Sequence, residues 1–157
     1  MSVRLSAATS VTPELIATAR LSVVTHGQGF IEITREAQRF ITEARADAGL
    51  LVVFMRHTSA SLVIQENADP DVRTDLTTAL GRVAPADAGW VHDVEGPDDM
   101  PAHVKTMLTG VSLHVPVIEG VLALGTWQGI YVAEHRDRPH QREIVLQFIG
   151  SRRPRAD

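Results

Sequence analysis

The sequence of 157 residues predicts one domain of the α+β class. Amphipathic helical patterns alternate with strand-like runs through the first two thirds of the chain. From Val111 onward, short strand-like runs follow one another with turns between them, which is typical of antiparallel hairpins. No internal repeat or linker-like stretch divides the sequence. We therefore expect mostly antiparallel sheets with about three helices in a single domain.

The first part of the chain is expected to contain a lead-in, a strand and a helix. Residues 1–17 are small and polar with no clear period, and they predict an irregular N-terminal lead-in before a domain at 18–151. Residues 20–26 have the apolar core of a strand. Apolar side chains then recur at i, i+3, i+4 and i+7, namely Ala37, Phe40, Ile41 and Ala44. We expect Gly49 to end this helix.

A pair of strands and a second helix follow. Residues 50–55 form a continuous apolar run that predicts a buried strand, and residues 58–65 continue with strand-forming side chains. Asp69 and Pro70 then supply a helix cap and a proline at the first helical position. The buried face of this helix is expected to consist of Val72, Leu76, Ala79, Leu80 and Val83.

The last helix and the hairpins complete the domain. Pro101 offers a helix start with two aspartates just ahead of it, and Gly110 offers its end. Strands are predicted at residues 113–117, 121–124, 128–134 and 143–150, with a turn at 119–120. The basic residues 152–157 are expected to form a frayed C-terminal tail.

Composition limits the possible partners. The formal net charge of −4 gives no electrostatic reason to expect nucleic acid or an acidic membrane surface. The longest wholly apolar run, residues 50–55, is far shorter than the roughly 20 residues that span a bilayer, and no signal-peptide core follows the N-terminus. We therefore expect a cytoplasmic protein with a small-molecule partner. Because the chain has no cysteine, any metal ion must be held by histidine and carboxylate ligands.

The segment at residues 92–103 is the most unusual part of the sequence. It places two imidazoles and four carboxylates in one loop and the helix start that follows. Neighbouring carboxylates repel one another unless a cation, an imidazole or a hydrogen-bond donor lies among them. His103 would lie in the first helical turn, where the helix dipole favours a neutral imidazole with a free lone pair. His92 and His103 are therefore candidate metal ligands, although their spacing matches no local zinc motif and structural histidines are common.

Two further segments carry dense polar side chains. Alternation along a strand would place His57, Ser59 and Ser61 on one face, able either to orient a ligand or simply to face solvent. Glu66 is a candidate base or ligand, whereas Asp69 is better explained as a helix cap.

Farther along, two glycines flank Trp127 and Gln128, and glycine within a strand often marks close backbone approach. These two side chains would then line a pocket for flat rings, or the tryptophan would close the edge of the core. Four basic side chains are candidate phosphate contacts or ordinary surface charges, without any phosphate-binding glycine loop: Arg56, Lys105, Arg136 and Arg142.

Taken together, three co-linear segments resemble the YjbQ-like family, described as secondary thiamine-phosphate synthase enzymes. The segments are HTSASLVIQENADPDVRTDL, HDVEGPDDMPAHVK and LGTWQGIYVAEHR, the last followed by Arg142. The resemblance covers about residues 20–150 and has no counterpart for the lead-in. It implies a β-sandwich-like YjbQ-like fold that associates as a homotrimer, with the polar motif residues gathered near a subunit boundary.

The resemblance also implies a reaction. Hydroxymethylpyrimidine diphosphate would be joined to hydroxyethylthiazole phosphate, forming thiamine phosphate and releasing diphosphate. A divalent metal ion, Mg²⁺ or Zn²⁺, suits the neutralisation of the departing charge. On this basis the metal ligands are expected to be His92, His103 and His135, and the acid/base residues His57 and Glu66. The expected substrate contacts are Ser59, Lys105, Trp127, Gln128 and Arg136.

Two other classes of function stay open at the level of sequence. A metal-dependent hydrolase of a small phosphorylated compound would use the same ion and acids with water as the nucleophile. A non-catalytic trimer that captures a small ligand would bind without turnover and would tolerate the loss of Glu66. Release of phosphate would distinguish the hydrolase from the synthase. Binding of a ligand with no product would distinguish the non-catalytic trimer from both.

Overall fold

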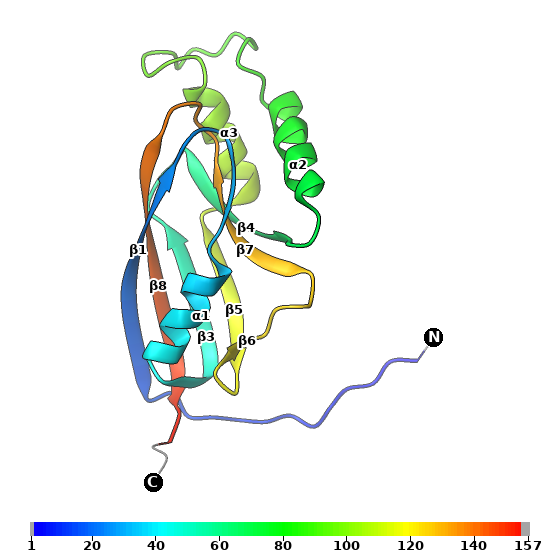
Figure 1. Ribbon diagram of the computed structural model, residues 1–157, viewed down its shortest axis with the longest axis vertical. Coiled ribbons are helices and arrows are strands. Elements are labelled where there is room, and N and C mark those ends of the chain that lie inside the picture. Colours follow the sequence, from blue (N-terminus) through cyan, green and yellow to red (C-terminus); the bar gives the residue numbers. More distant parts are fainter. Residues whose placement is uncertain (1, 155–157) are drawn as a thin grey trace.

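The computed structural model describes residues 2–154 as an α+β domain with two antiparallel sheets (Figure 1). The five-stranded sheet has the strand order β1-β8-β3-β5-β6, and the three-stranded sheet has the order β2-β7-β4. The strands are β1 (Leu15–Thr25), β2 (Gly29–Glu32), β3 (Ala46–Met55), β4 (Ala60–Glu66), β5 (Ser112–Ile118), β6 (Val121–Leu122), β7 (Gln128–Glu134) and β8 (His140–Arg152). The helices are α1 (Thr34–Glu43), α2 (Pro70–Val83) and α3 (Asp99–Thr109). The predicted class, the antiparallel pairing and the three helices are confirmed.

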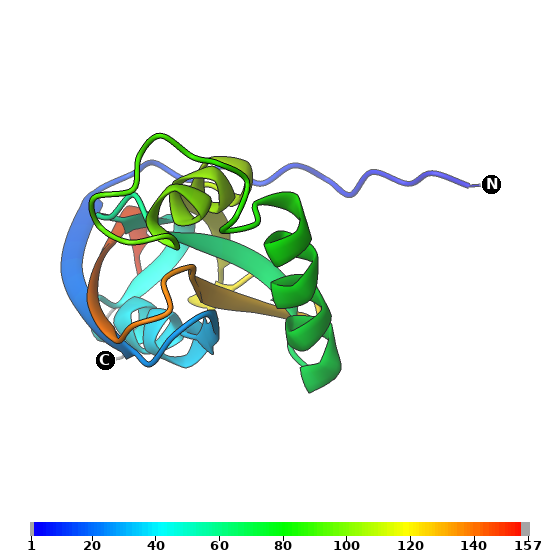
Figure 2. The ribbon, with the colours of Figure 1, turned by 90° about the horizontal axis from the view of Figure 1, so that it is seen from above.

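The core lies between the inner face of the five-stranded sheet, the three-stranded sheet and α1. Alternate residues of β8 point inward, so Ile144, Leu146 and Phe148 are buried while the residues between them are partly exposed. Helix α1 contributes Ala37, Phe40 and Ile41, three members of the predicted apolar face. Viewed from above, α2 lies on the far side of β4 and β7 from β1, outside this core (Figure 2).

Gly49 does not end α1, which stops at Glu43, but lies within β3. A side chain at Gly49 would place its Cβ 2.3 Å from the carbonyl oxygen of Ile149, and one at Gly150 would lie 2.2 Å from that of Ala48. The two glycines face each other across β3 and β8 at a point where the register shifts. Close strand contact, rather than helix termination, therefore explains this glycine.

Helix α2 begins as predicted but does not pack as predicted. Asp69 caps it by accepting a hydrogen bond from the backbone N–H of Asp71 at 2.8 Å, and Pro70 is its first residue. None of its side chains is buried, and Val83 is 59% exposed. The expected buried face is wrong for the single chain, in which β2 and α3 cover the helix only partly and Arg73 lies over the ring of Tyr131 on β7.

The chain ends and loops differ from expectation by a few residues. Strand β1 starts at Leu15, so the last three residues of the predicted lead-in are paired with β8. The turn at residues 119–120 is present, with positive φ at both Glu119 and Gly120. Strand β2 has only four residues and was not predicted.

Among the described residues, no helix combines the length and apolar character needed to cross a bilayer.

Candidate functional site

Two histidines and one aspartate from the acidic segment meet at the start of α3. Asp99 is the first residue of the helix, His103 lies one turn later, and His92 comes from the preceding loop. The Oδ2 atom of Asp99 lies 2.8 Å from Nε2 of His92 and 3.4 Å from Nε2 of His103. The carboxylate is 3% exposed, whereas the imidazoles are 47% and 32% exposed. The carboxylate of Asp99 is therefore buried, whereas the two imidazoles that contact it are accessible to solvent.

A backbone carbonyl fixes the tautomer of neutral His103. Its Nδ1 lies 2.9 Å from the carbonyl oxygen of Thr58, which can only accept, so Nδ1 carries the proton and donates. Nε2 then presents a lone pair toward the carboxylate oxygen of Asp99. Two lone pairs facing each other repel unless a positive charge lies between them. A cation between the two atoms would relieve this repulsion.

Arg136 forms ion pairs with the two aspartates at the start of α3, Asp98 and Asp99. Its Nε donates to Oδ2 of Asp98 at 3.0 Å, one terminal nitrogen pairs with Oδ1 of Asp99, and the other donates to the carbonyl oxygen of Glu95 at 2.7 Å. Although burial opposes ionisation, hydrogen bonds from the backbone of Asp137 and from Arg136 keep the pKa of Asp98 below its usual value. Arg136, predicted as a substrate contact, thus positions the acids in this chain.

Glu134, the last residue of β7, forms a buried ion pair with Arg142. Nε and a terminal nitrogen of Arg142 donate to its two carboxylate oxygens at 2.7 and 2.6 Å. Thr25 adds a hydrogen bond at 2.8 Å, and the backbone N–H groups of His135 and Arg136 donate at 3.0 Å each. The carboxylate therefore fixes the end of β7 from which His135 and Arg136 extend.

His135, predicted as a metal ligand, lies apart from the His92–Asp99–His103 group. Its ring is 2% exposed, and Nε2 lies 2.8 Å from the hydroxyl of Ser61. Burial, reinforced by the charge of Lys105, lowers the pKa of His135 to about 4. Lys105 is itself buried and donates to the side-chain oxygen of Gln28 at 2.9 Å, and burial lowers its pKa. In the single chain, neither side chain is available to a phosphate.

The neutral state of His135 predicts acid sensitivity. The unfolded chain binds a proton at this residue below about pH 6.5, whereas the folded chain does so only near pH 4. Stability is therefore complete above pH 6.5 and falls by about 3 kcal/mol as the pH drops to 4. Urea unfolding of the wild type and of His135→Gln at several pH values measures the slope. The slope should become shallower in His135→Gln and stay unchanged in the exposed control His26→Gln; equal slopes in all three proteins would contradict the assignment.

His57 is engaged by the backbone. Its Nε2 accepts the N–H of Glu143 at 2.9 Å, so the proton of the neutral ring is on Nδ1. Burial, together with the charge of Arg142, lowers the pKa of His57. Ser59, expected on the same face, contributes its carbonyl oxygen to Arg142 at 3.4 Å. Ser61 instead turns inward toward His135.

Glu66, Trp127 and Gln128 lie at the other end of the three-stranded sheet. Strand β4 separates Ala60, near the imidazoles, from Glu66 by about 20 Å at roughly 3.3 Å per residue. Glu66 pairs with Gln128 across β4 and β7, and Trp127 is 64% exposed. Within one chain, the expected site residues therefore form two separate groups.

The sequence located the two exposed imidazoles but not every group that acts with them. The two aspartates ahead of the helix start, Asp98 and Asp99, were given no role among the ligands, and Asp99 contacts both rings directly. The i, i+4 spacing of Asp99 and His103 on α3 is the signal for this contact. No sequence signal identifies the carbonyl group of Thr58, because it comes from a loop far along the chain.

Comparison with known proteins agrees with the architecture and the motifs. The profile of the family described as UPF0047 protein YjbQ-like matches residues 19–151. A UPF0047 protein from Synechocystis sp. is 47% identical over 131 residues, covering 83% of this chain and 89% of the relative. The YjbQ protein of Escherichia coli O157:H7 is 40% identical, with 83% and 95% covered.

A solved structure from Clostridium acetobutylicum, a member of the yjbq/upf0047 family, superposes with a TM-score of 0.78. It is 38% identical and covers 83% of this chain and 98% of its own length. The names of these relatives give the family and no reaction. The profile match spans both the imidazole group and the Glu66–Gln128 end of the sheet. The chain accordingly belongs to the UPF0047 family of YjbQ-like proteins.

Proposed function

We propose that His92, Asp99 and His103 hold a divalent metal ion. The observation that carries the proposal is the lone pair of His103 directed at an ionised carboxylate, since a cation between them satisfies both. One ligand atom from each residue lies within 4.8 Å of the others. In tetrahedral zinc sites with bonds of about 2.0 Å, ligand atoms are about 3.3 Å apart, so only small movements are needed. The partly exposed imidazoles leave a position open for a substrate oxygen.

The reaction that we propose at this site is the synthesis of thiamine phosphate as a secondary activity. The bond between the pyrimidine methylene carbon and the diphosphate oxygen breaks, a bond to the thiazole nitrogen forms, and diphosphate leaves. When bound, a divalent ion supplies positive charge for the departing diphosphate. Arg136 pairs with Asp98 and Asp99 and orients both carboxylates, so the chain can hold such an ion with only small movements.

A product assay separates this reaction from its alternatives. Purified protein with added Mg²⁺ or Zn²⁺ is incubated with the two phosphorylated substrates, and thiamine phosphate, diphosphate and phosphate are quantified. Equal amounts of thiamine phosphate and diphosphate are expected. Phosphate without thiamine phosphate would contradict the synthase and favour the hydrolase. Calorimetric binding of the substrates with no product would favour the ligand-capturing trimer.

We further propose that three copies associate through the outer face of the five-stranded sheet. Adjacent positions across β1, β8, β3 and β5 on this face are Ile16, Ile149, Leu50 and Pro116. Phe54 lies on the same face of β3 as Leu50 and is 43% exposed. On β1, Ile16 is 70% exposed. The next row along these strands is more polar and contains Thr18, Gln147 and His114 beside Val52. The apolar row and Phe54 are the part of this face that is typical of an interface.

Size-exclusion chromatography with light scattering tests the assembly. The 17.1 kDa chain should elute as a particle of about 51 kDa. Phe54→Asp places a charge within the proposed interface and should yield the single chain, because burying an unpaired charge is costly. Val94→Asp, at a residue that is 91% exposed in a loop, is the matched control. A single-chain mass for the wild type would contradict the trimer.

The distance between Glu66 and the imidazoles leads to a sharper proposal. Because about 20 Å of β4 separates the two groups within one chain, Glu66 can act with them only from a neighbouring copy. His103→Ala and Glu66→Ala chains, each inactive alone, should regain activity when they are co-refolded into mixed oligomers. Mixed oligomers as inactive as their parents would show that the two groups do not share a site.

A further inference from the structure

The N-terminal arm, residues 2–13, extends away from the domain that it precedes. All of its residues are exposed, and Figures 1 and 2 show it leaving the base of β1 and continuing past the opposite side of the domain. Glu14 ties the end of the arm to the sheet, because its backbone N–H donates to the carbonyl oxygen of Gly150 at 2.9 Å. The family profile begins at residue 19. The arm therefore lies outside the part of the chain that the family defines.

The arm begins with the side-chain pattern of a β-strand. Val3, Leu5 and Ala7 are apolar, and Arg4 and Ser6 stand between them. Such alternation is typical of a strand that has one face against an apolar surface. In the single chain, however, Val3 and Leu5 are 97% and 98% exposed. The apolar face of the arm thus lacks the cover that its pattern predicts.

Strand β1 is an open edge of the five-stranded sheet. It pairs with β8 on one side, and no strand pairs with its other side among residues 2–154. Figures 1 and 2 show no part of the domain beyond this side. Edge strands are usually protected by prolines, bulges or several charges, whereas the 11 residues of β1 include one charged side chain, Arg20, and no proline. The edge therefore offers a row of backbone N–H and C=O groups to an added strand.

A cleft beside this edge has room for apolar side chains. It has a volume of about 70 Å³ and lies between β1 and α1, where Ala19, Leu21 and Phe40 contribute to its lining. Ala17, Ala19 and Leu21 pack against the core but stay only partly buried. A strand added beside β1 would direct every second side chain toward this face of the sheet. The apolar residues of the arm match that requirement.

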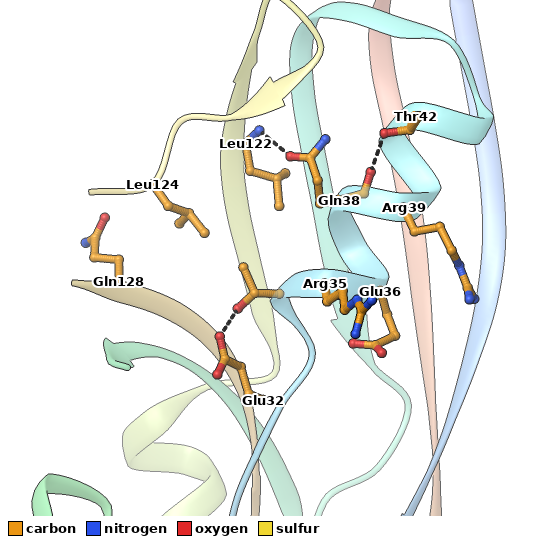
Figure 3. A pocket seen from close by; sticks show the side chains of 10 residues that line it. Glu32, Arg35, Glu36, Gln38, Arg39, Thr42, Leu122, Leu124 and Gln128 are labelled. Atoms are coloured by element: carbon orange, nitrogen blue, oxygen red, sulfur yellow. Dashed lines mark hydrogen bonds between the residues drawn. The ribbon is translucent and has the colours of Figure 1, made fainter. Parts of the chain in front are cut away.

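A larger groove on the other side of α1 is the alternative seat for the arm. It has a volume of about 850 Å³, and Figure 3 shows Leu122 and Leu124 across it from the helix. Arg39 points away from these leucines and also lines the smaller cleft beside β1. An extended segment gains backbone hydrogen bonds at a strand edge, whereas the side chains of a helix and a loop line this groove. The β1 edge therefore suits the arm better.

The arm and the β1 edge lie on opposite sides of the domain. Figure 1 shows β1 at the left, whereas the arm leaves to the right, beyond β5 and β6. Crossing the five-stranded sheet takes about 19 Å at roughly 4.8 Å per strand spacing, and the extended arm reaches about 40 Å at roughly 3.3 Å per residue. About 20 Å, or roughly six residues, thus remains beyond the domain. This length corresponds to the alternating segment.

We propose that the N-terminal arm of one copy adds a strand to the β1 edge of a second copy, with Val3, Leu5 and Ala7 against the cleft between β1 and α1. Such a contact joins two different surfaces head to tail and closes into a ring when it is repeated around an axis. A direct pair of β1 strands would instead form a two-fold dimer. The inference shares the trimer with the proposed function but requires neither the metal nor the reaction, so the proposals can fail separately.

Paramagnetic labelling locates the arm. The chain has no cysteine, so Ser6→Cys provides a single position for a nitroxide. Labelled chains are co-refolded with ¹⁵N-labelled wild-type chains, and the ¹H–¹⁵N spectrum is compared before and after reduction of the nitroxide. We expect signal loss at the amides of residues 17–21 in the wild-type chains, which carry no nitroxide themselves. Loss confined to Leu122 and Leu124, to other elements or to no residue at all would overturn the proposal.

Two matched variants test the contribution of the arm to assembly. Leu5→Asn should raise the concentration at which the oligomer dissociates by about tenfold or more, because an apolar side chain no longer enters the interface. Ser6→Asn, on the opposite face of the arm, should dissociate like the wild type. Light scattering over a dilution series measures both, and urea unfolding confirms that each domain is folded.

The outcomes separate the arm from the rest of the assembly. A wild-type trimer with equal dissociation in Leu5→Asn and Ser6→Asn would overturn the role of the arm and leave the interface on the outer sheet face in place. A wild-type dimer would favour a direct pair of β1 strands and would overturn the proposal. A single-chain mass would contradict both the arm exchange and the trimer.

Discussion

Replacing Glu134 by alanine should lower the free energy of unfolding by about 3–5 kcal/mol, the cost of leaving a buried charge without its partner. Arg142 is 3% exposed and donates two hydrogen bonds to this carboxylate. Removal of the carboxylate would leave the guanidinium with the 3.4 Å hydrogen bond to the carbonyl oxygen of Ser59, and the hydroxyl of Thr25 would lose its acceptor. Two backbone N–H groups would lose their acceptor as well.

Urea denaturation of matched variants measures this effect. Glu143→Ala removes a neighbouring carboxylate that pairs with Arg56 on the surface, and it should cost less than about 1 kcal/mol. The double variant Glu134→Leu/Arg142→Met should recover much of the loss, because apolar residues that replace both partners leave no buried charge. A loss below about 1 kcal/mol in Glu134→Ala would show that the pair is not a stabilising element.

The Glu134–Arg142 pair predicts a second loss of stability at lower pH, after the loss that His135 causes. Burial opposes ionisation of Glu134, but the hydrogen bonds from Arg142, the Arg136 backbone and Thr25 outweigh it and hold its pKa below the usual value. A carboxyl group with a depressed folded pKa contributes stability above its unfolded pKa, and this contribution is lost as the pH falls through the folded pKa. Loss of stability from His135 therefore begins first, from about pH 6.5, and loss from Glu134 follows below about pH 4.5.

Local patterns were sufficient for most of the fold. Strand β7 matches its predicted bounds, and the Asp69–Pro70 helix start and the Gly110 helix end were both correctly located. Gly49 was misread because a glycine after a helical pattern resembles a helix end, whereas its role depends on Gly150, about one hundred residues away. The exposed face of α2 could not be foreseen, since periodicity identifies an apolar face but not what covers it.

The site was less predictable because consecutive residues serve different networks. Glu134, His135 and Arg136 follow one another at the end of β7, yet they contact Arg142, Ser61 and Asp99, respectively. Alternation along a strand separates His135 from its neighbours, and this explains why it lies away from the exposed imidazoles. Residue type marked His135 and Arg136 as functional candidates and missed Glu134, and only the folded structure assigns each one its contact.

Replacing His103 by alanine should remove both the bound metal and the synthase activity. The substitution deletes one of three ligands and leaves the carbonyl oxygen of Thr58 without its donor. We expect metal affinity to fall by about 100-fold or more, since even residues that only support metal ligands contribute about 10–100-fold. Zn²⁺ binding followed by calorimetry, and thiamine phosphate formation at saturating metal, measure the two effects independently.

Comparison with other variants separates metal binding from folding. Asp99→Asn keeps the shape of the side chain but removes the charge between the imidazoles, so it should weaken metal binding as His103→Ala does. His26→Ala, at an exposed histidine between β1 and β2, should keep wild-type affinity and activity. If His103→Ala and Asp99→Asn bound Zn²⁺ like the wild type, the ion would lie elsewhere.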